Sequence, residues 1–429
     1  MHTLGKIMRN RLPALGLGLV SAFGMVAVIG VTAPAAMAQK ADKSGKQPPE
    51  SKEFVAAYNA AVAAMQVKDW ATELTNATTA VSLAKNPGAK LPAQQMQLQA
   101  YAGLGNKPEM LKAVEALLGE QGLPADQIKN YRSVQMGLYS ELNNDAKAIE
   151  LTKAFMKDYG GTPDQYLFLA SYEAKQNDCP NAITDANKAI DGYKSAGQKP
   201  KETAYSILLK CYVDAKDNPN YYATVERAYG DYPKSELLRP LIDRTTKEPK
   251  FNRQKNILDV YRALAAAKVE LKPSELADIG EQALSRANSS EAEKAFAQAD
   301  KAGWTGVDAT NQTRYKKMYE KAQADAKKDA AGGLAASEKD AATSPKGGVY
   351  ANVADAYLGA GDNAKAIELF QKGLAKGAMD EGETAYAKLG LGIAQSRNGQ
   401  KEDAVKTWGE IKGDNGAAVL AHDYILMSK

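Results

Sequence analysis

The strongest constraint on the fold is a helix-turn-helix pattern that recurs along the chain. Within residues 347–378, two segments with helical spacing of apolar residues flank a turn at Gly361-Asp362-Asn363. Side chains four residues apart lie on one face of a helix, and small ones let two helices approach closely. The first segment aligns Val353, Ala354 and Tyr357, and the second aligns Ala366, Phe370 and Leu374. The pattern predicts two helices packed as a hairpin.

The same pattern returns elsewhere in the chain. Residues 385–413 repeat it, with Leu391-Gly392 before a turn and Trp408 after it, and another copy begins at Pro273. Two further copies are 34 residues apart, as Ala148 and Ala182 show. Weaker copies begin near Phe54, Gln95 and Thr203. Because runs of alternating Val, Ile and Thr are missing, we expect an all-α chain without strands.

These residues resemble the tetratricopeptide repeat family, whose unit is a helix-turn-helix of 34 residues. The family pattern places a bulky-then-small pair in the first helix, as in Ile279-Gly280, and an aromatic residue between small ones in the second, as in Phe296. The resemblance covers most of 52–413. It implies a superhelical solenoid of about nine or ten hairpins, and the segment after residue 413 is similar to the extra helix that caps such stacks.

The N-terminus has the features of a secretory signal peptide. Residues 1–13 carry Lys6, Arg9 and Arg11 without an acid, an uncharged apolar run covers 14–31, and Ala36-Met37-Ala38 suits signal peptidase. We therefore expect cleavage after Ala38 and a periplasmic or secreted protein without a membrane span. The alternative is an uncleaved anchor, since the apolar run is near the lower limit for spanning a membrane.

The domain organisation follows from these patterns and from shifts in composition. Residues 326–346 contain Leu334 as their one large apolar side chain, so they form either a hinge or a divergent repeat. The expected parts are a signal peptide at 1–38, a flexible tether at 39–50, a tetratricopeptide-like array at 51–325, the low-complexity segment at 326–346, and a pair of repeats with a cap helix at 347–429.

Composition argues against catalysis and against metal or cofactor binding. The chain has two histidines, His2 and His422, and two cysteines, Cys179 and Cys211, too few for a Cys/His zinc site. Nucleotide-loop, zinc-protease and nucleophile-elbow motifs are missing. Removal of 1–38 lowers the net charge from +4 to +1, so nucleic-acid binding is not expected. An enzyme built on a pair of carboxylates stays open.

The two cysteines leave two alternatives. An exported chain meets an oxidising compartment, where a bond between Cys179 and Cys211 would form if neighbouring repeats bring them together. The repeat frame instead points Cys211 toward the groove, which favours two separate thiols.

The resemblance implies that a partner binds along the concave face, which the first helices line. In the middle of the chain this face carries Asn130, Ser133 and Asp164, among others. The candidate groove in the last two repeats consists of Asp355, Leu358, Tyr386, Leu389, Ile393, Ser396 and Arg397. Alternatively, the cap helix covers this strip through Val419, Leu420 and Ile425. We expect a non-catalytic scaffold of the bacterial envelope that binds a protein or an extended peptide. The alternative is an accessory protein in the export or organisation of a cell-surface polysaccharide.

Overall fold

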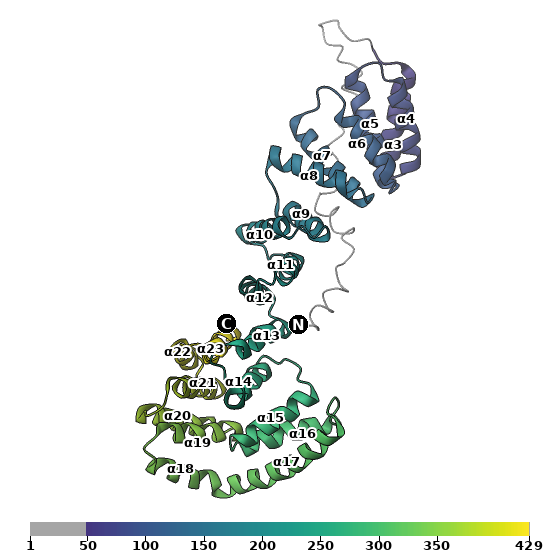
Figure 1. Ribbon diagram of the computed structural model, residues 1–429. Helices are drawn as coiled ribbons and strands as arrows, with labels where there is room; N and C mark the ends of the chain where they lie inside the picture. Colours follow the sequence, from purple (N-terminus) through teal and green to yellow (C-terminus); the bar gives the residue numbers. More distant parts are fainter. Residues whose placement is uncertain (1–48, 429) are drawn as a thin grey trace. The chain divides into compact units, whose positions relative to one another are not determined.

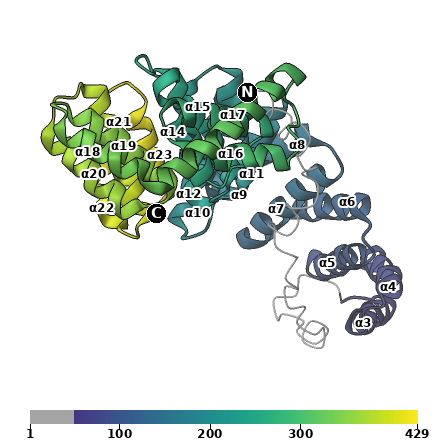
Figure 2. The same ribbon diagram turned by 90° about the horizontal axis from the view of Figure 1, so that it is seen from below.

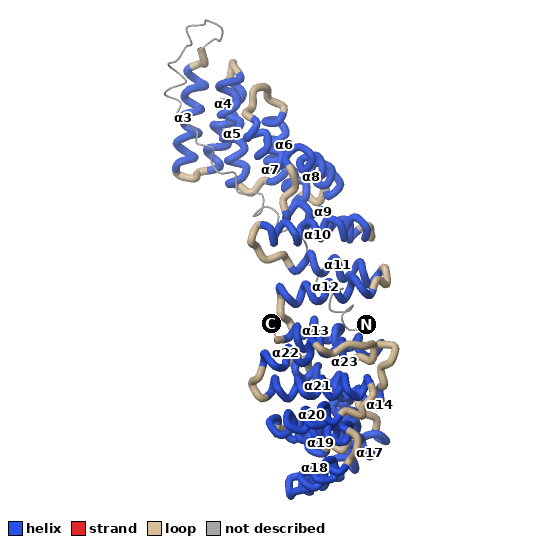
Figure 3. Tube along the Cα trace, turned by 90° about the vertical axis from the view of Figure 1, so that its left-hand side faces the viewer, coloured by secondary structure: helices blue, strands red, loops and turns tan. Residues whose placement is uncertain are grey.

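The computed structural model describes residues 49–428, and every regular element in that range is a helix (Figure 3). The expected signal peptide, with its cleavage site at Ala38, and most of the tether lie outside the described residues. The chain divides into two compact units, Met1–Ala215 (unit 1) and Lys216–Lys429 (unit 2). The division therefore falls between residues 215 and 216, not at the low-complexity segment.

Unit 1 is a succession of antiparallel helical hairpins, coloured from purple to teal in Figure 1. Consecutive helices pack on one another, as α3, α4 and α5 do in both Figures 1 and 2. The helices are α3 (Lys52–Gln66), α4 (Trp70–Leu83), α5 (Pro87–Gly103), α6 (Lys107–Leu118), α7 (Ala125–Glu141), α8 (Asp145–Tyr159), α9 (Pro163–Lys175), α10 (Cys179–Ser195) and α11 (Glu202–Asp214).

Unit 2 continues the same construction to the C-terminus. Its helices are α12 (Asn218–Asp231), α13 (Ser235–Asp243), η2 (Arg244–Lys247), α14 (Arg253–Ala266), α15 (Pro273–Ser285), α16 (Ser289–Lys301), α17 (Ala309–Lys328), η3 (Asp329–Gly333), α18 (Leu334–Thr343), α19 (Gly347–Ala360), α20 (Asn363–Lys376), α21 (Glu381–Arg397), α22 (Lys401–Gly409) and α23 (Ala417–Met427).

A recurring turn closes the hairpins. In unit 1 the residue before the N-cap has a positive φ at Lys68, Asn143 and Asn177. The next residue is Asp or Asn, whose side chain accepts a hydrogen bond from the helix it starts, as Asp69 does from the Thr72 N–H at 3.2 Å. The capping bond satisfies a backbone donor that would otherwise lack a partner, and it sets where each second helix begins.

The bulky-then-small pairs pack as the resemblance implies. A β-carbon on Gly280 would lie 2.6 Å from the ring of Phe296, and one on Gly392 would lie 2.2 Å from the Trp408 ring. Only glycine leaves room for these rings, which are almost completely buried between the two helices of each hairpin. The glycine and the aromatic ring therefore fix the separation of the helices.

Residues 326–343 are helical, and 344–346 connect α18 to α19. α17 continues into η3, where the backbone kinks at Gly332 with a φ of 110°. α18 then packs on α19, and Glu338 of α18 forms a 2.8 Å ion pair with Lys365 of α20. The segment is thus part of the stack of hairpins in unit 2.

Candidate functional site

A pocket in unit 1 lies among α7, α8 and α9, and its volume is about 210 Å³. Two consecutive first helices, α7 and α9, line it together with the end of α8. The lining residues are Lys129, Asn130, Ser133, Phe155, Tyr159, Gly160, Thr162, Asp164 and Gln165. Three of them, Asn130, Ser133 and Asp164, belong to the concave face expected from the sequence.

The start of α9 forms one wall of the pocket. Pro163 occupies the first turn, where its missing N–H costs nothing. Thr162 and Gln165 form a capping box, in which the Gln165 N–H donates to the Thr162 hydroxyl and the Thr162 N–H donates to the Gln165 side chain at 2.9 Å. The reciprocal bonds hold this wall rigidly.

Asp164 is held by two donors, Tyr193 of α10 and Lys201, the residue before α11. The Lys201 ammonium lies 2.6 Å from its carboxylate, and the Tyr193 hydroxyl donates to the same oxygen. Partial burial works to raise the pKa of Asp164, but the bonds from Lys201 and Tyr193 lower it below its ordinary value. Burial and the Asp164 carboxylate raise the pKa of Tyr193. Asp164 is therefore an ionised but compensated group at the pocket wall.

The opposite wall carries polar groups with spare bonding capacity. Within the described chain, the side chains of Asn130 and Ser133 form no hydrogen bond and Lys129 forms no ion pair. The Lys129 ammonium lies 5.4 Å from the centre of the Tyr159 ring, which in turn packs at 4.7 Å from the Phe155 ring. Tyr159 is one of the few large apolar side chains that stay exposed. The pocket thus combines an aromatic surface with unused donors and acceptors.

The groove expected in the last two repeats is closed. Leu358 and Leu389 have no exposed surface and Ile393 is 2% exposed, because α21 is packed against α19, α20, α22 and α23. The Tyr386 hydroxyl donates to the Asn415 carbonyl at 2.9 Å. Ser396 is half-buried and Arg397 is exposed. The prediction of an open binding strip here is wrong, since these apolar residues form core.

Asp355 is also used internally. Its carboxylate lies 2.5 Å from Arg262 of α14 and 3.0 Å from Arg286 at the end of α15. Arg262 bonds in addition to Asp259 and Glu291, and its side chain is almost wholly buried. Buried charges persist only when paired, and this network gives Asp355 two arginine partners within unit 2. Asp355 is not a free groove residue.

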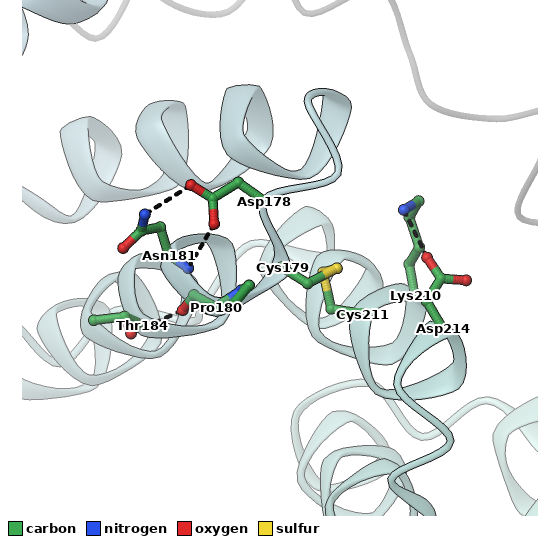
Figure 4. Close-up of a disulfide and its surroundings, with 8 residues drawn as sticks. All are labelled: Asp178, Cys179, Pro180, Asn181, Thr184, Lys210, Cys211 and Asp214. Carbon is green, nitrogen blue, oxygen red and sulfur yellow. Dashed lines mark hydrogen bonds and ion pairs between the residues drawn. A yellow bond between two sulfur atoms is a disulfide. The ribbon is translucent and has the colours of Figure 1, made fainter.

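Cys179 and Cys211 form a disulfide (Figure 4). Cys179 is the first residue of α10 and Cys211 lies on α11, with their Cα atoms 5.3 Å apart. The side chain of Cys211 faces the core between helices, not the groove, so the bond joins one hairpin to the next.

No group of three or more His, Cys, Asp or Glu side chains in residues 49–428 could hold a metal ion. Among the helices of the same range, none is long and apolar enough to cross a bilayer.

Comparison with known proteins gives no match to a protein-family model and none to a curated protein. Solved structures do match. A tetratricopeptide repeat protein from Parabacteroides merdae is 9% identical with a TM-score of 0.33, over 80% of this chain and 100% of that one. The P58(IPK) TPR domain is 12% identical with a TM-score of 0.22, over 87% and 98%. Naa15/Naa10 bound to HypK-THB is 13% identical with a TM-score of 0.28, over 86% and 65%.

The chain is built of tetratricopeptide-like repeats. Two features of the hairpins support this assignment. Gly280 packs on Phe296 and Gly392 packs on Trp408, and capped turns connect the helices. Sequence reasoning found part of the α7–α9 pocket through its repeat frame. It missed Lys129 and Tyr159, which only the packing of α7 against α8 brings together.

Proposed function

We propose that this chain is a non-catalytic scaffold that binds an extended segment of a partner protein across the first helices of unit 1. The α7–α9 pocket carries the proposal. Its volume of about 210 Å³ is below the roughly 300–1,000 Å³ of small-molecule sites, so it suits one side chain of a longer ligand. Asn130 and Ser133 offer the donors and acceptors that the backbone of an extended peptide needs.

A protein ligand is favoured over a polysaccharide. The sugar hypothesis relied on Tyr and Trp rings stacking on a glycan. Trp304 and Trp408 are 3% and 2% exposed, so these two indole rings have no free face for stacking on a sugar. Trp70 is half-buried, with its ring over Gly103. Binding of glycan is kept as one outcome of the test below.

The test compares two substitutions on α7. Asn130→Trp fills the pocket, whereas Asp126→Trp places the same ring one turn earlier, outside the lining; both side chains are exposed, so neither change disturbs the core. We expect Asn130→Trp to weaken binding of the partner at least tenfold and Asp126→Trp to leave it unchanged, at equal melting temperatures. Equal binding of the partner by both variants would exclude this pocket. If Asn130→Trp instead lost binding to a glycan and kept binding to the protein, the polysaccharide alternative would be favoured.

We further propose that the protein works in the bacterial envelope after export and cleavage at Ala38. Support comes from the sequence of residues 1–38 and from the Cys179–Cys211 bond, because disulfides persist in oxidising compartments. In intact cells we expect both cysteines to resist thiol reagents after denaturation. A chain without residues 2–38 stays in the cytosol, and its cysteines should react. Free thiols in the full-length protein would contradict export.

A further inference from the structure

The C-terminal helix α23 makes more contacts than a terminal cap requires. It packs on α21 and α22, which precede it directly, and also on α13, η2 and α14, about 150 or more residues earlier. In Figure 1, α23 lies next to α13 and α22, with α14 and α21 directly below it. Toward α22, the Tyr424 ring stacks on the Trp408 ring with the two ring centres 4.9 Å apart. α23 therefore joins the first and last hairpins of unit 2.

Polar contacts hold α23 to the earlier helices. Arg244 of η2 lies 3.1 Å from Asp423 and 3.0 Å from Glu226, and the His422 ring nitrogen lies 3.1 Å from the other Glu226 oxygen. The loop before α23 is fastened as well, since Lys250 and Asp414 form an ion pair at 3.0 Å.

Asp423 is an unusual group to place at such a contact. Its side chain has no exposed surface, and one of its oxygens has no hydrogen-bond donor. Burial raises the pKa of Asp423 to about 7, with Arg244 acting against the shift and Glu226 adding to it. An ionised carboxylate with an unsatisfied oxygen is costly to bury, so the neutral acid fits this position better.

Other charged groups near α23 influence the pKa of Tyr424, the residue after Asp423. Arg397 of α21 and the buried network of Arg262, Asp259 and Glu291 surround Tyr424, and burial, the largest influence, raises the pKa of that tyrosine. On α23 itself His422 points to solvent and to Glu226. Asp423 is thus the carboxyl group of α23 that has no exposed surface.

We propose that α23 is a latch that closes unit 2 by joining α21 and α22 to α13, η2 and α14, and that rising pH weakens the latch. In the closed state Asp423 keeps its proton up to about pH 7, whereas a released carboxyl ionises near its ordinary value of 3.8. Between about pH 3.8 and pH 7, closure of α23 is therefore accompanied by uptake of a proton at Asp423. The equilibrium constant for closure of α23 falls by up to about tenfold for each pH unit in this range and does not change at higher pH.

Hydrogen exchange of the full-length protein measures the latch directly. Protection factors of the α23 amides, corrected for the intrinsic pH dependence of exchange, should fall by up to about 100-fold from pH 5 to pH 7 and stay level from pH 7.5 to 9. The amides of α20 should keep their protection throughout. Asp423→Asn, which imitates the neutral acid, should make α23 protection independent of pH.

Asp403→Asn serves as the matched control, because Asp403 is an exposed acid on α22. It should show the wild-type pH dependence. The proposal is overturned if α23 protection in the wild type does not change with pH, or if the pH dependence persists in Asp423→Asn. It is equally overturned if α23 and α20 lose protection together, since α23 would then open only when unit 2 unfolds.

Discussion

Glu73 occupies a position at which other repeats of this chain have a small apolar residue. It lies four residues after the N-cap of α4, where the corresponding residues of α8, α10 and α20 are Ala148, Ala182 and Ala366. All four side chains are completely buried, and neither Glu73 oxygen has a partner. Burial raises the pKa of Glu73 to about 7.

This position predicts a pH-dependent stability of the first hairpin. Because the folded state keeps the Glu73 proton to about pH 7, stability falls as pH rises from about 4.5 to 7 and is then level. Glu73→Ala should stabilise α3 and α4 by about 2 kcal/mol at pH 8, and by much less at pH 5. Hydrogen exchange of the α4 amides measures this, with Glu150→Ala on the exposed face of α8 as the control. A variant that is less stable than wild type at pH 8 would show that Glu73 contributes packing instead.

At the level of elements, helices with large apolar residues were predictable and the alanine-rich ones were not. Trp408 and Phe370 indicate α22 and α20 because each ring needs a facing small residue, which Gly392 and Gly390 supply. In α17 and α18 the buried residues are alanines such as Ala326 and Ala341. An alanine gains little from burial but allows close approach of helices, so composition alone does not separate such a helix from a hinge.

The candidate groove failed for a different reason. The spacing of Leu389 and Ile393 correctly indicates one apolar face of a helix, but whether that face is open depends on α23. The position of α23 depends in turn on η2 and α14, whose contacts with it join residues far apart in the sequence. Periodicity within one repeat contains no information about such contacts.

At the scale of the whole molecule, the two units use their tetratricopeptide-like helices differently. In unit 2, charges such as Arg262 and Asp355 pair with each other, and α19, α20, α22 and α23 pack against α21. In unit 1, the side chains of Asn130 and Ser133 form no hydrogen bond within the described residues and Lys129 forms no ion pair there, and all three line the α7–α9 pocket. The sequence predicted the all-α repeat architecture, which the structure confirms. A binding site on the concave face stays a prediction, and we propose the α7–α9 pocket of unit 1 for it.

Site-specific photo-crosslinking in intact cells tests this central claim most directly. A photoreactive amino acid replaces Ser133 in the pocket or Asp403 on the exposed face of α22, and mass spectrometry identifies the attached peptides. The account predicts adducts from position 133 to one segment of one partner protein, lost when Asn130→Trp is added, and no adduct with that partner from position 403. Adducts with the partner from position 403 and none from position 133 would contradict it.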